Sequence, residues 1–285
     1  MKILVVAGVL TGLAALVATA LWSGQRTLVY FPDATDVPPT EELLPDLPGA
    51  RDVVLRTSDD LDLRASYVPA GPECEVTVLL TPGNGGNRAG RTALVRGLAE
   101  QGLGVLAVDY RGYGGNPGSP SEAGTRRDAR AAYAFLTRDE GIAPARLLYF
   151  GESLGGAVAA DLAAEHPPGA VLLRSPFTSL AAMARAVYGA PTGPLLRDEY
   201  VVTDAVGRFG AAAPGTPFTV VLGDADAIVP ATQSREVAAA GRDAGLDVDE
   251  VVLPGADHNE PVLVHGPEVL DAAAALADRI GGDCS

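Results

Sequence analysis

The chain has 285 residues, of which 47 % are apolar and 20 % are charged, and this composition is typical of a globular protein rather than a disordered one. Its formal net charge of −15 disfavours nucleic acid as a partner, because an acidic surface repels the phosphate backbone. The length suffices for one α/β domain of about 250 residues with a large core.

The N-terminal segment, residues 1–25, is predicted to be a transmembrane anchor or a signal peptide. Residues 3–22 carry no charged side chain, and an apolar run of about 20 residues is long enough to span a bilayer. This length favours a retained anchor, which would make the membrane a partner of the chain. Ala-Thr-Ala at 18–20 matches the cleavage site of a secretory signal and favours removal. Either alternative places the domain at 26–285 outside the cytoplasm.

Beyond residue 48, short β-rich runs alternate with helical runs. The runs at 52–56 and 61–68 flank a polar turn, which is typical of an antiparallel hairpin at a sheet edge. Short apolar runs bounded by Gly, Pro and Asp predict buried parallel strands. They lie at 76–80, 105–108, 147–150, 171–173, 218–222 and 248–253. Ala and Leu at helical spacing predict helices at 91–100, 121–138, 154–165, 232–244 and 267–280.

This order of elements predicts the α/β fold class. We expect a doubly wound, mostly parallel sheet of about eight strands with helices on both faces, in which ligands bind at the carboxyl ends of the strands. The segment 179–217 is the least regular part of the domain. It is expected to form a short cap of one or two helices over that edge of the sheet.

A glycine-rich turn, GESLGG at 151–156, follows an apolar strand and precedes an Ala-rich helix. This is the setting of a nucleophile elbow, and it predicts Ser153 as a catalytic nucleophile. Gly151 and Gly155 would remove side chains that clash with the strained turn, and Gly156 would let the helix pack closely on the sheet. The alternative is a glycine-rich turn that serves packing alone.

A serine hydroxyl needs a base, and the chain has three histidines. His258 follows the last predicted strand, so it lies at a carboxyl end as Ser153 does. His166 ends the helix that Ser153 begins, which places it at the opposite end of the domain, beside the negative end of the helix dipole. His265 opens the last predicted helix and is expected at the surface. The sequence therefore predicts His258 as the base.

The histidine requires a carboxylate that fixes its tautomer. The loop after the strand at 218–222 contains Asp224 and Asp226, and either is chemically suitable. Asp226 is preferred, because Asp224 directly follows a glycine and is expected to serve the turn. Asp257 is expected to cap its own loop. The order Ser, Asp, His along the chain is typical of α/β hydrolases.

Two backbone N–H groups should bind the oxyanion of an acyl-transfer intermediate. One is expected from Leu154, the residue after the nucleophile. The other is expected from Asn84, in the loop TPGNGGN at 81–87 that follows a central strand. This chemistry requires neither a metal nor a cofactor.

The cysteines, Cys74 and Cys284, form no CxxC pair, so a zinc or thioredoxin-like site is not expected. Outside the cytoplasm they would form one disulfide between the C-terminal tail and the loop before a central strand. Two unpaired thiols are the equally acceptable alternative.

Several ordered motifs carry a family resemblance. They are LVYFP at 28–32, PGNGGN at 82–87, DYRGYG at 109–114, GESLGG at 151–156, RSPFTSL at 174–180 and the loops around Asp226 and His258. Together they resemble the Bem46-like or ABHD13-like branch of the α/β-hydrolase superfamily. The family usually has His-Gly-Asn at the oxyanion loop, where this chain has Pro82-Gly83-Asn84.

The resemblance implies an esterase, lipase-like or acyl-thioesterase activity on a small-molecule ester or thioester. A serine peptidase is disfavoured, because the chain has no propeller or other size-excluding domain. A binding protein that keeps the fold without catalysis is the alternative from another functional class.

Overall fold

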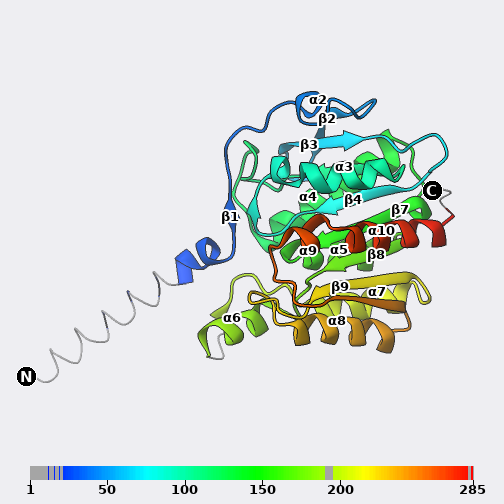
Figure 1. Ribbon diagram of the computed structural model, residues 1–285. Coiled ribbons are helices and arrows are strands. Elements are labelled where there is room, and N and C mark those ends of the chain that lie inside the picture. The colour runs from blue at the N-terminus through cyan, green and yellow to red at the C-terminus, as the bar shows by residue number, and fades with distance from the viewer. Residues whose placement is uncertain are drawn as a thin grey trace, which may run out of the picture.

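The structure of the chain, a computed structural model, describes residues 12, 16, 19, 22–189, 195–281 and 284. Most of the predicted membrane segment, residues 3–22, therefore lies outside the described residues. Among those that are described, no helix is both long and apolar enough to cross a membrane. A short 3₁₀ turn, η1 (Gln25–Leu28), leads into the folded domain (Figure 1).

The domain is built on a sheet to which the described part of the chain contributes eight strands, in the order β10-β9-β8-β7-β4-β6-β3-β2. Neighbouring strands are parallel, except for the antiparallel pairs of β3 with β2 and with β6. The strands are β2 (Arg51–Arg56), β3 (Asp62–Val68), β4 (Thr77–Thr81), β6 (Gly104–Val108), β7 (Leu147–Glu152), β8 (Ala170–Arg174), β9 (Pro217–Gly223) and β10 (Asp247–Leu253). The predicted class, the mostly parallel sheet and the edge hairpin are confirmed.

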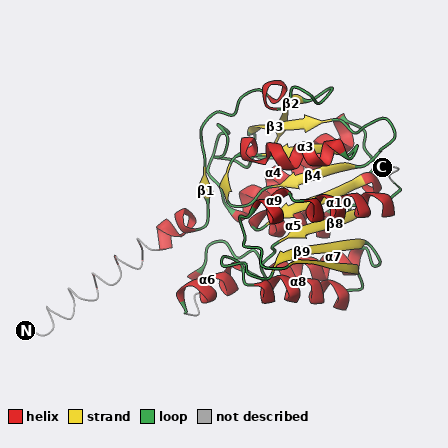
Figure 2. Ribbon diagram, in the orientation of Figure 1, coloured by secondary structure: helices red, strands yellow, loops and turns green. Residues whose placement is uncertain are grey.

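Helices cover both faces of the sheet (Figure 2). Apolar side chains of α3, α9 and α10 join one core cluster, and those of α4, α5, α7 and α8 join the other. Successive residues of a central strand alternate between the clusters, as Leu79 and Leu80 of β4 do, which explains why these strands are apolar throughout. The helices are α3 (Thr92–Glu100), α4 (Glu122–Ala134), α5 (Leu154–Glu165), α7 (Val202–Ala212), α8 (Ala231–Asp243), α9 (Pro261–His265) and α10 (Pro267–Arg279).

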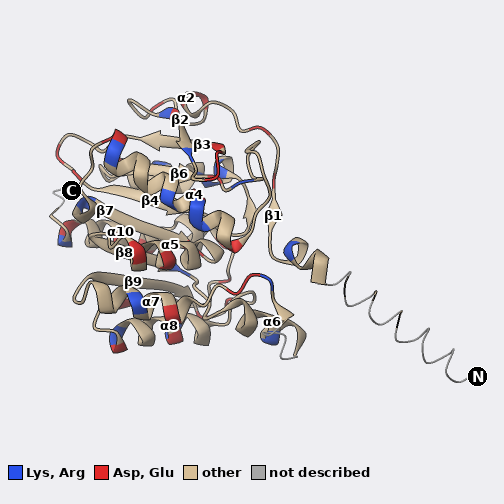
Figure 3. Ribbon diagram, turned by 180° about the vertical axis from the view of Figure 1, so that it is seen from behind, with Lys and Arg blue, Asp and Glu red and all other residues tan. Residues whose placement is uncertain are grey.

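Helix α5 positions the candidate nucleophile, and it is buried from Leu154 to Ala163. A helix that is apolar on nearly all sides belongs in a core, and here the sheet, α4 and α7 surround it. Two ion pairs join α5 to α4: Arg126 to Asp161 at 2.8 Å and Arg130 to Glu165 at 2.5 Å. Figure 3 shows basic positions in blue along α4 and acidic positions in red along α5. Packing and charge together fix α5 against its neighbours.

The segment 179–217, predicted as a short cap, divides into two parts. Helix α6 (Leu180–Tyr188) has no fully buried residue and stands away from the layers of the domain (Figure 1). Helix α7 packs against α5 and α8 and belongs to the helical layer. Only α6 and its flanking residues are therefore placed to cover a site at the carboxyl end of the sheet.

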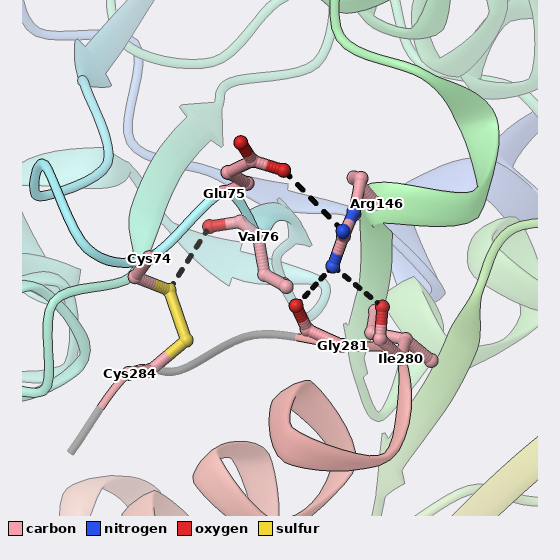
Figure 4. Close-up of a disulfide and its surroundings, with 7 residues drawn as sticks. All are labelled: Cys74, Glu75, Val76, Arg146, Ile280, Gly281 and Cys284. Atoms are coloured by element: carbon pink, nitrogen blue, oxygen red, sulfur yellow. Dashed lines mark hydrogen bonds and ion pairs between the residues drawn. A yellow bond between two sulfur atoms is a disulfide. The ribbon is translucent and has the colours of Figure 1, made fainter.

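A disulfide joins Cys74, in the loop before β4, to Cys284 near the C-terminus, with the two Cα atoms 4.6 Å apart (Figure 4). Arg146 holds the same tail, because its guanidinium donates hydrogen bonds to the carbonyl oxygens of Ile280, at 2.9 Å, and Gly281. Of the two alternatives that the sequence leaves open, the structure has the paired cysteines.

Candidate active site

Ser153 occupies the single position between the end of β7 and the start of α5. Its backbone has φ 51° and ψ −111°, a conformation that L-residues rarely adopt and that costs about 1–3 kcal/mol. The N–H of Ser153 donates to the carbonyl oxygen of Arg174 at 2.8 Å, which ties the turn to β8. Strained backbone of this kind is typical of functional sites.

The glycines around Ser153 differ in how strongly packing requires them. A Cβ atom on Gly155 would lie 2.0 Å from the carbonyl oxygen of Thr81, and one on Gly151 would lie 2.5 Å from Cα of Gly156. These two positions admit no side chain, as the sequence predicts. A Cβ atom on Gly156 would lie 3.6 Å from the nearest atom, an ordinary contact. The expectation that close packing requires Gly156 is therefore wrong.

His258 and Asp226 form a buried pair on the loops that follow β10 and β9. Nδ1 of His258 lies 2.7 Å from Oδ2 of Asp226. The other carboxylate oxygen accepts the backbone N–H groups of Ile228, at 2.9 Å, and Val229, at 2.7 Å. Burial acts to raise the pKa of Asp226, but the His258 bond and these backbone donors outweigh it and hold the pKa below its ordinary value. The structure thus brings His258 and Asp226 together as an imidazole–carboxylate pair.

The carboxylates of the other two aspartates in these loops accept hydrogen bonds from backbone N–H groups. Asp224 is exposed and accepts the N–H of Gly255 at 2.6 Å, which links the two loops. Asp257 accepts the N–H groups of Ala227, at 2.8 Å, and His258, at 2.7 Å. Both carboxylates therefore fix the loops that present the His258–Asp226 pair, and neither is the partner of the imidazole.

The two remaining histidines lie elsewhere. His166 follows the last residue of α5 and stacks on Tyr133, with ring centroids 4.3 Å apart. His265 ends α9 instead of opening the last helix, because a separate short helix, which the sequence did not predict, precedes the Pro267 that begins α10. Neither lines the cavity that contains Ser153 and His258.

The predicted oxyanion loop, residues 81–87, is held by contacts with the N-terminal segment and with Tyr113. Asn84 donates from Nδ2 to the carbonyl oxygen of Val29 at 2.8 Å, and its own carbonyl oxygen accepts the Tyr113 hydroxyl at 2.8 Å. These bonds support the short parallel pair of β1 (Phe31–Pro32) with β5 (Gly85–Gly86), which the sequence did not indicate. Within the described part of the chain, the backbone N–H groups of Asn84 and Leu154 form no hydrogen bond, so both are available to a ligand.

An apolar cavity of about 310 Å³ opens beside Ser153. One wall comes from α6, and the opposite wall comes from the chain around η1 and β1. Its apolar lining includes Leu28, Val29, Phe31, Leu154, Phe177, Leu180, Met183, Val187 and Tyr188. A hydrocarbon chain bound there would reach the Ser153 hydroxyl.

A buried ionic cluster behind Ser153 was not predicted from the sequence. The carboxylate of Glu152 accepts hydrogen bonds from Nε of Arg91 at 3.2 Å and from Nη2 of Arg174 at 3.3 Å. Nη1 of Arg174 donates to the carbonyl oxygen of His258 at 3.1 Å. Burial acts to raise the pKa of Glu152, but the two guanidinium groups outweigh it and hold the pKa below its ordinary value. The available signal was a charged residue at the carboxyl end of each of two apolar strands, β7 and β8.

The fold and this geometry define the class of protein. A serine at a strained strand-to-helix turn, with a histidine and an aspartate at later strand ends, is the arrangement of an α/β hydrolase. The structure of the Pyrococcus furiosus esterase Pf2001 has the same fold, with a TM-score of 0.70 at 20 % identity, over 88 % of this chain and 100 % of that chain.

Comparison with known proteins identifies the family. Residues 72–197 match the family model described as serine aminopeptidase, S33. The Mycobacterium tuberculosis protein Rv2307c is 45 % identical over 258 residues, which cover 88 % of this chain and 86 % of that protein. Protein bem46 of Schizosaccharomyces pombe is 32 % identical over 193 residues, which cover 62 % of this chain and 64 % of bem46. The chain belongs to the Bem46-like branch of the α/β-hydrolase superfamily, as the resemblance of its motifs implied.

Proposed function

We propose that this hydrolase cleaves carboxylic esters or thioesters through an acyl-enzyme intermediate on Ser153. The observation that carries the proposal is the 2.7 Å contact between His258 Nδ1 and Asp226 Oδ2, at the cavity that His258 shares with Ser153. A serine hydroxyl is a poor nucleophile at neutral pH, and an imidazole held by a carboxylate is the base that activates it.

The proposed reaction has two similar halves. Ser153 Oγ attacks the carbonyl carbon while Nε2 of His258 takes the hydroxyl proton, and Asp226 stabilises the resulting imidazolium. The oxygen of the tetrahedral intermediate accepts hydrogen bonds from the N–H groups of Leu154 and Asn84. His258 then gives its proton to the departing oxygen or sulfur. A water molecule, deprotonated in turn by His258, attacks the acyl group and releases the acid and free Ser153.

The apolar cavity supports an acyl substrate. Its walls suit a hydrocarbon chain, and α6 covers it as a lid of one helix. The esterase Pf2001 has the same fold, which agrees with this substrate class. A serine peptidase and a non-catalytic binding protein are the competing functions, and one pair of experiments separates all three.

A fluorescent fluorophosphonate is expected to label the purified protein on the peptide that contains Ser153, because His258 activates this hydroxyl. Ser153→Ala should abolish the labelling. Ser175→Ala is the matched control: Ser175 also has a positive φ, of 46°, but its buried hydroxyl forms no hydrogen bond to a described residue and so has no base to activate it. Labelling should therefore persist in this variant. Absence of labelling, or equal labelling of Ser153→Ala, would support the binding protein.

The same protein should release p-nitrophenol from p-nitrophenyl esters, with a preference for acyl chains that fill the apolar cavity. It should leave the corresponding p-nitroanilide amides intact. Turnover of peptide p-nitroanilides at rates comparable to those of the esters would instead support the peptidase.

We also propose that the domain at 26–285 lies outside the cytoplasm, anchored by residues 3–22 or released after their removal. The disulfide supports this location, because disulfides persist in oxidising compartments. Trp22, Leu28 and Phe31 are more than half exposed, which suits a chain that leaves a membrane at this point.

Cell fractionation tests the location. Carbonate-washed membranes should retain a chain with an intact N-terminus if the anchor is kept, whereas a shortened soluble chain would indicate cleavage. In either form Cys74 and Cys284 should resist alkylation until they are reduced. Recovery in the cytosol with two free thiols would contradict the proposal.

A further inference from the structure

A second cavity, of about 360 Å³, lies on the His258 side of Ser153. The apolar cavity also has charged residues in its lining, Arg26, Arg197 and Asp198, among many apolar ones. Charged side chains form a larger share of the second, smaller lining: Arg91, Glu152 and Arg174. Among the lining residues, two guanidinium groups and one ionised carboxylate sum to a net charge of +1; the Asp226 carboxylate lies behind His258 and does not line the cavity. That charge is of opposite sign to the −15 of the whole chain.

Each of the two arginines has an N–H group that is not used in the hydrogen bonds to Glu152 or to the backbone. Nε of Arg174 is buried and forms no hydrogen bond within the part of the chain that the structure describes. Nη1 of Arg91 is fixed by the carbonyl oxygens of Gly85, at 2.8 Å, and Asn87, at 3.2 Å, and its Nε is bound to Glu152. No hydrogen bond to a described residue uses Nη2 of Arg91. Nη2 of Arg91 is not buried: the Arg91 side chain is 16 % exposed and lines the cavity, so this N–H group can donate to a ligand oxygen there.

The position of His258 identifies which part of a substrate would enter this cavity. In acyl transfer the histidine gives its proton to the leaving group, so the leaving group must lie on the histidine side of the serine. His258 lines the charged cavity and does not line the apolar one. The acyl chain therefore belongs in the apolar cavity and the alcohol or thiol part in the charged cavity.

We propose that the charged cavity is a leaving-group subsite that binds a carboxylate on the alcohol or thiol part of the substrate, with Arg91 as its main contact. This inference rests on the proposed hydrolase function. A guanidinium presents parallel N–H donors that match a carboxylate. The net charge of +1 matches the single negative charge of that group. The substrate class is then an ester or thioester with an apolar acyl chain and an anionic leaving group.

A matched pair of esters tests the subsite. The probes are 3-(butanoyloxy)benzoate and 3-(butanoyloxy)benzamide, which share the acyl chain and the aromatic ring and differ in charge. Rates are measured at 0.15 M salt, which screens the repulsion of the anionic probe by the acidic surface. The wild-type protein should prefer the benzoate by about tenfold or more in kcat/KM, since hydrogen bonds between charged groups have this strength.

Two variants test whether the preference for the benzoate ester comes from the charged cavity. Arg91→Gln reduces the charge of the cavity from +1 to zero, and the benzoate-to-benzamide ratio should fall to about one. Arg96→Gln makes the same change in α3, the helix that begins directly after Arg91, but the side chain of Arg96 pairs with the exposed Asp46. This control should keep the wild-type ratio. Because Arg91 also holds the oxyanion loop, the ratio is the readout and not the absolute rate.

Each outcome has a distinct meaning. Ser153-dependent hydrolysis of both esters without a preference would overturn the subsite and leave the proposed function intact. Equal losses on both esters in Arg91→Gln, with an unchanged ratio, would assign Arg91 a structural role and also overturn it. Absence of Ser153-dependent hydrolysis of either ester would overturn the proposed function itself.

Discussion

Replacement of Asp226 by asparagine is expected to lower kcat for ester hydrolysis about ten-thousandfold. Asparagine would still accept the backbone N–H groups of Ile228 and Val229 with its carbonyl oxygen. Its amide, however, would face Nδ1 of His258, which lies 2.7 Å from the carboxylate in the wild type, and would donate to it. The ring proton would then move to Nε2, and His258 could no longer take the proton of Ser153. Initial rates on a p-nitrophenyl ester measure the loss.

Asp224→Asn is the matched control for this experiment. Asp224 is two residues away, is exposed, and accepts only the N–H of Gly255 among the described hydrogen bonds. Surface substitutions of this kind usually change the free energy of unfolding by no more than about 0.5 kcal/mol. Even a change of that size in the activation free energy would alter the rate by only about twofold. A larger loss in Asp224→Asn than in Asp226→Asn would reassign the carboxylate of the triad.

Replacement of Gly155 by alanine is expected to lower the free energy of unfolding by more than about 3 kcal/mol. The new Cβ atom would lie 2.0 Å from the carbonyl oxygen of Thr81 and 2.6 Å from that of Pro82. Both are backbone atoms of the β4 end and the oxyanion loop, so the clash can be relieved only by moving α5 away from β4. Urea unfolding at 25 °C measures the change.

Gly156→Ala makes the same chemical change one residue further along α5. Its Cβ atom would meet only ordinary contacts, the nearest being Pro176 at 3.6 Å. Alanine is favoured over glycine in a helix interior by about 0.5–1 kcal/mol, so this variant should be as stable as the wild type or slightly more so. Comparable destabilisation of the two variants would contradict the packing described at the elbow.

The central strands and the long helices were predictable from local patterns. Helix α5 matches the predicted range of 154–165, because a strand, a glycine turn and an Ala-rich run give three successive signals. The parallel pair β1–β5 was not predictable, since each strand has two residues and the pairing depends on Asn84 binding Val29. Helix α7 was included in the predicted cap, because its position beside α5 is set by tertiary packing and not by periodicity.

The positions of Ser153, Asp226 and His258 at one edge of the sheet were predictable, because parallel strands end on the same side. The sequence favoured Asp226 over Asp224 only through the place of Asp224 directly after a glycine, and the hydrogen bonds of the two carboxylates, to His258 and to Gly255, distinguish them in the structure. The Glu152 cluster was not predicted, because its partners Arg91 and Arg174 are far apart in the sequence. Only the assembled sheet shows that they face one carboxylate.

The disulfide between Cys74 and Cys284 gives the chain the topology of a closed ring, because it connects residues 210 positions apart. Ser153, Asp226, His258 and helix α6 all lie within that ring. A protease that cuts once beside α6, where Val187 and Tyr188 are exposed, would open the ring without separating its parts. The nicked chain would keep its full mass until a reductant divides it in two. The disulfide therefore keeps both parts of a chain cut at this point covalently joined.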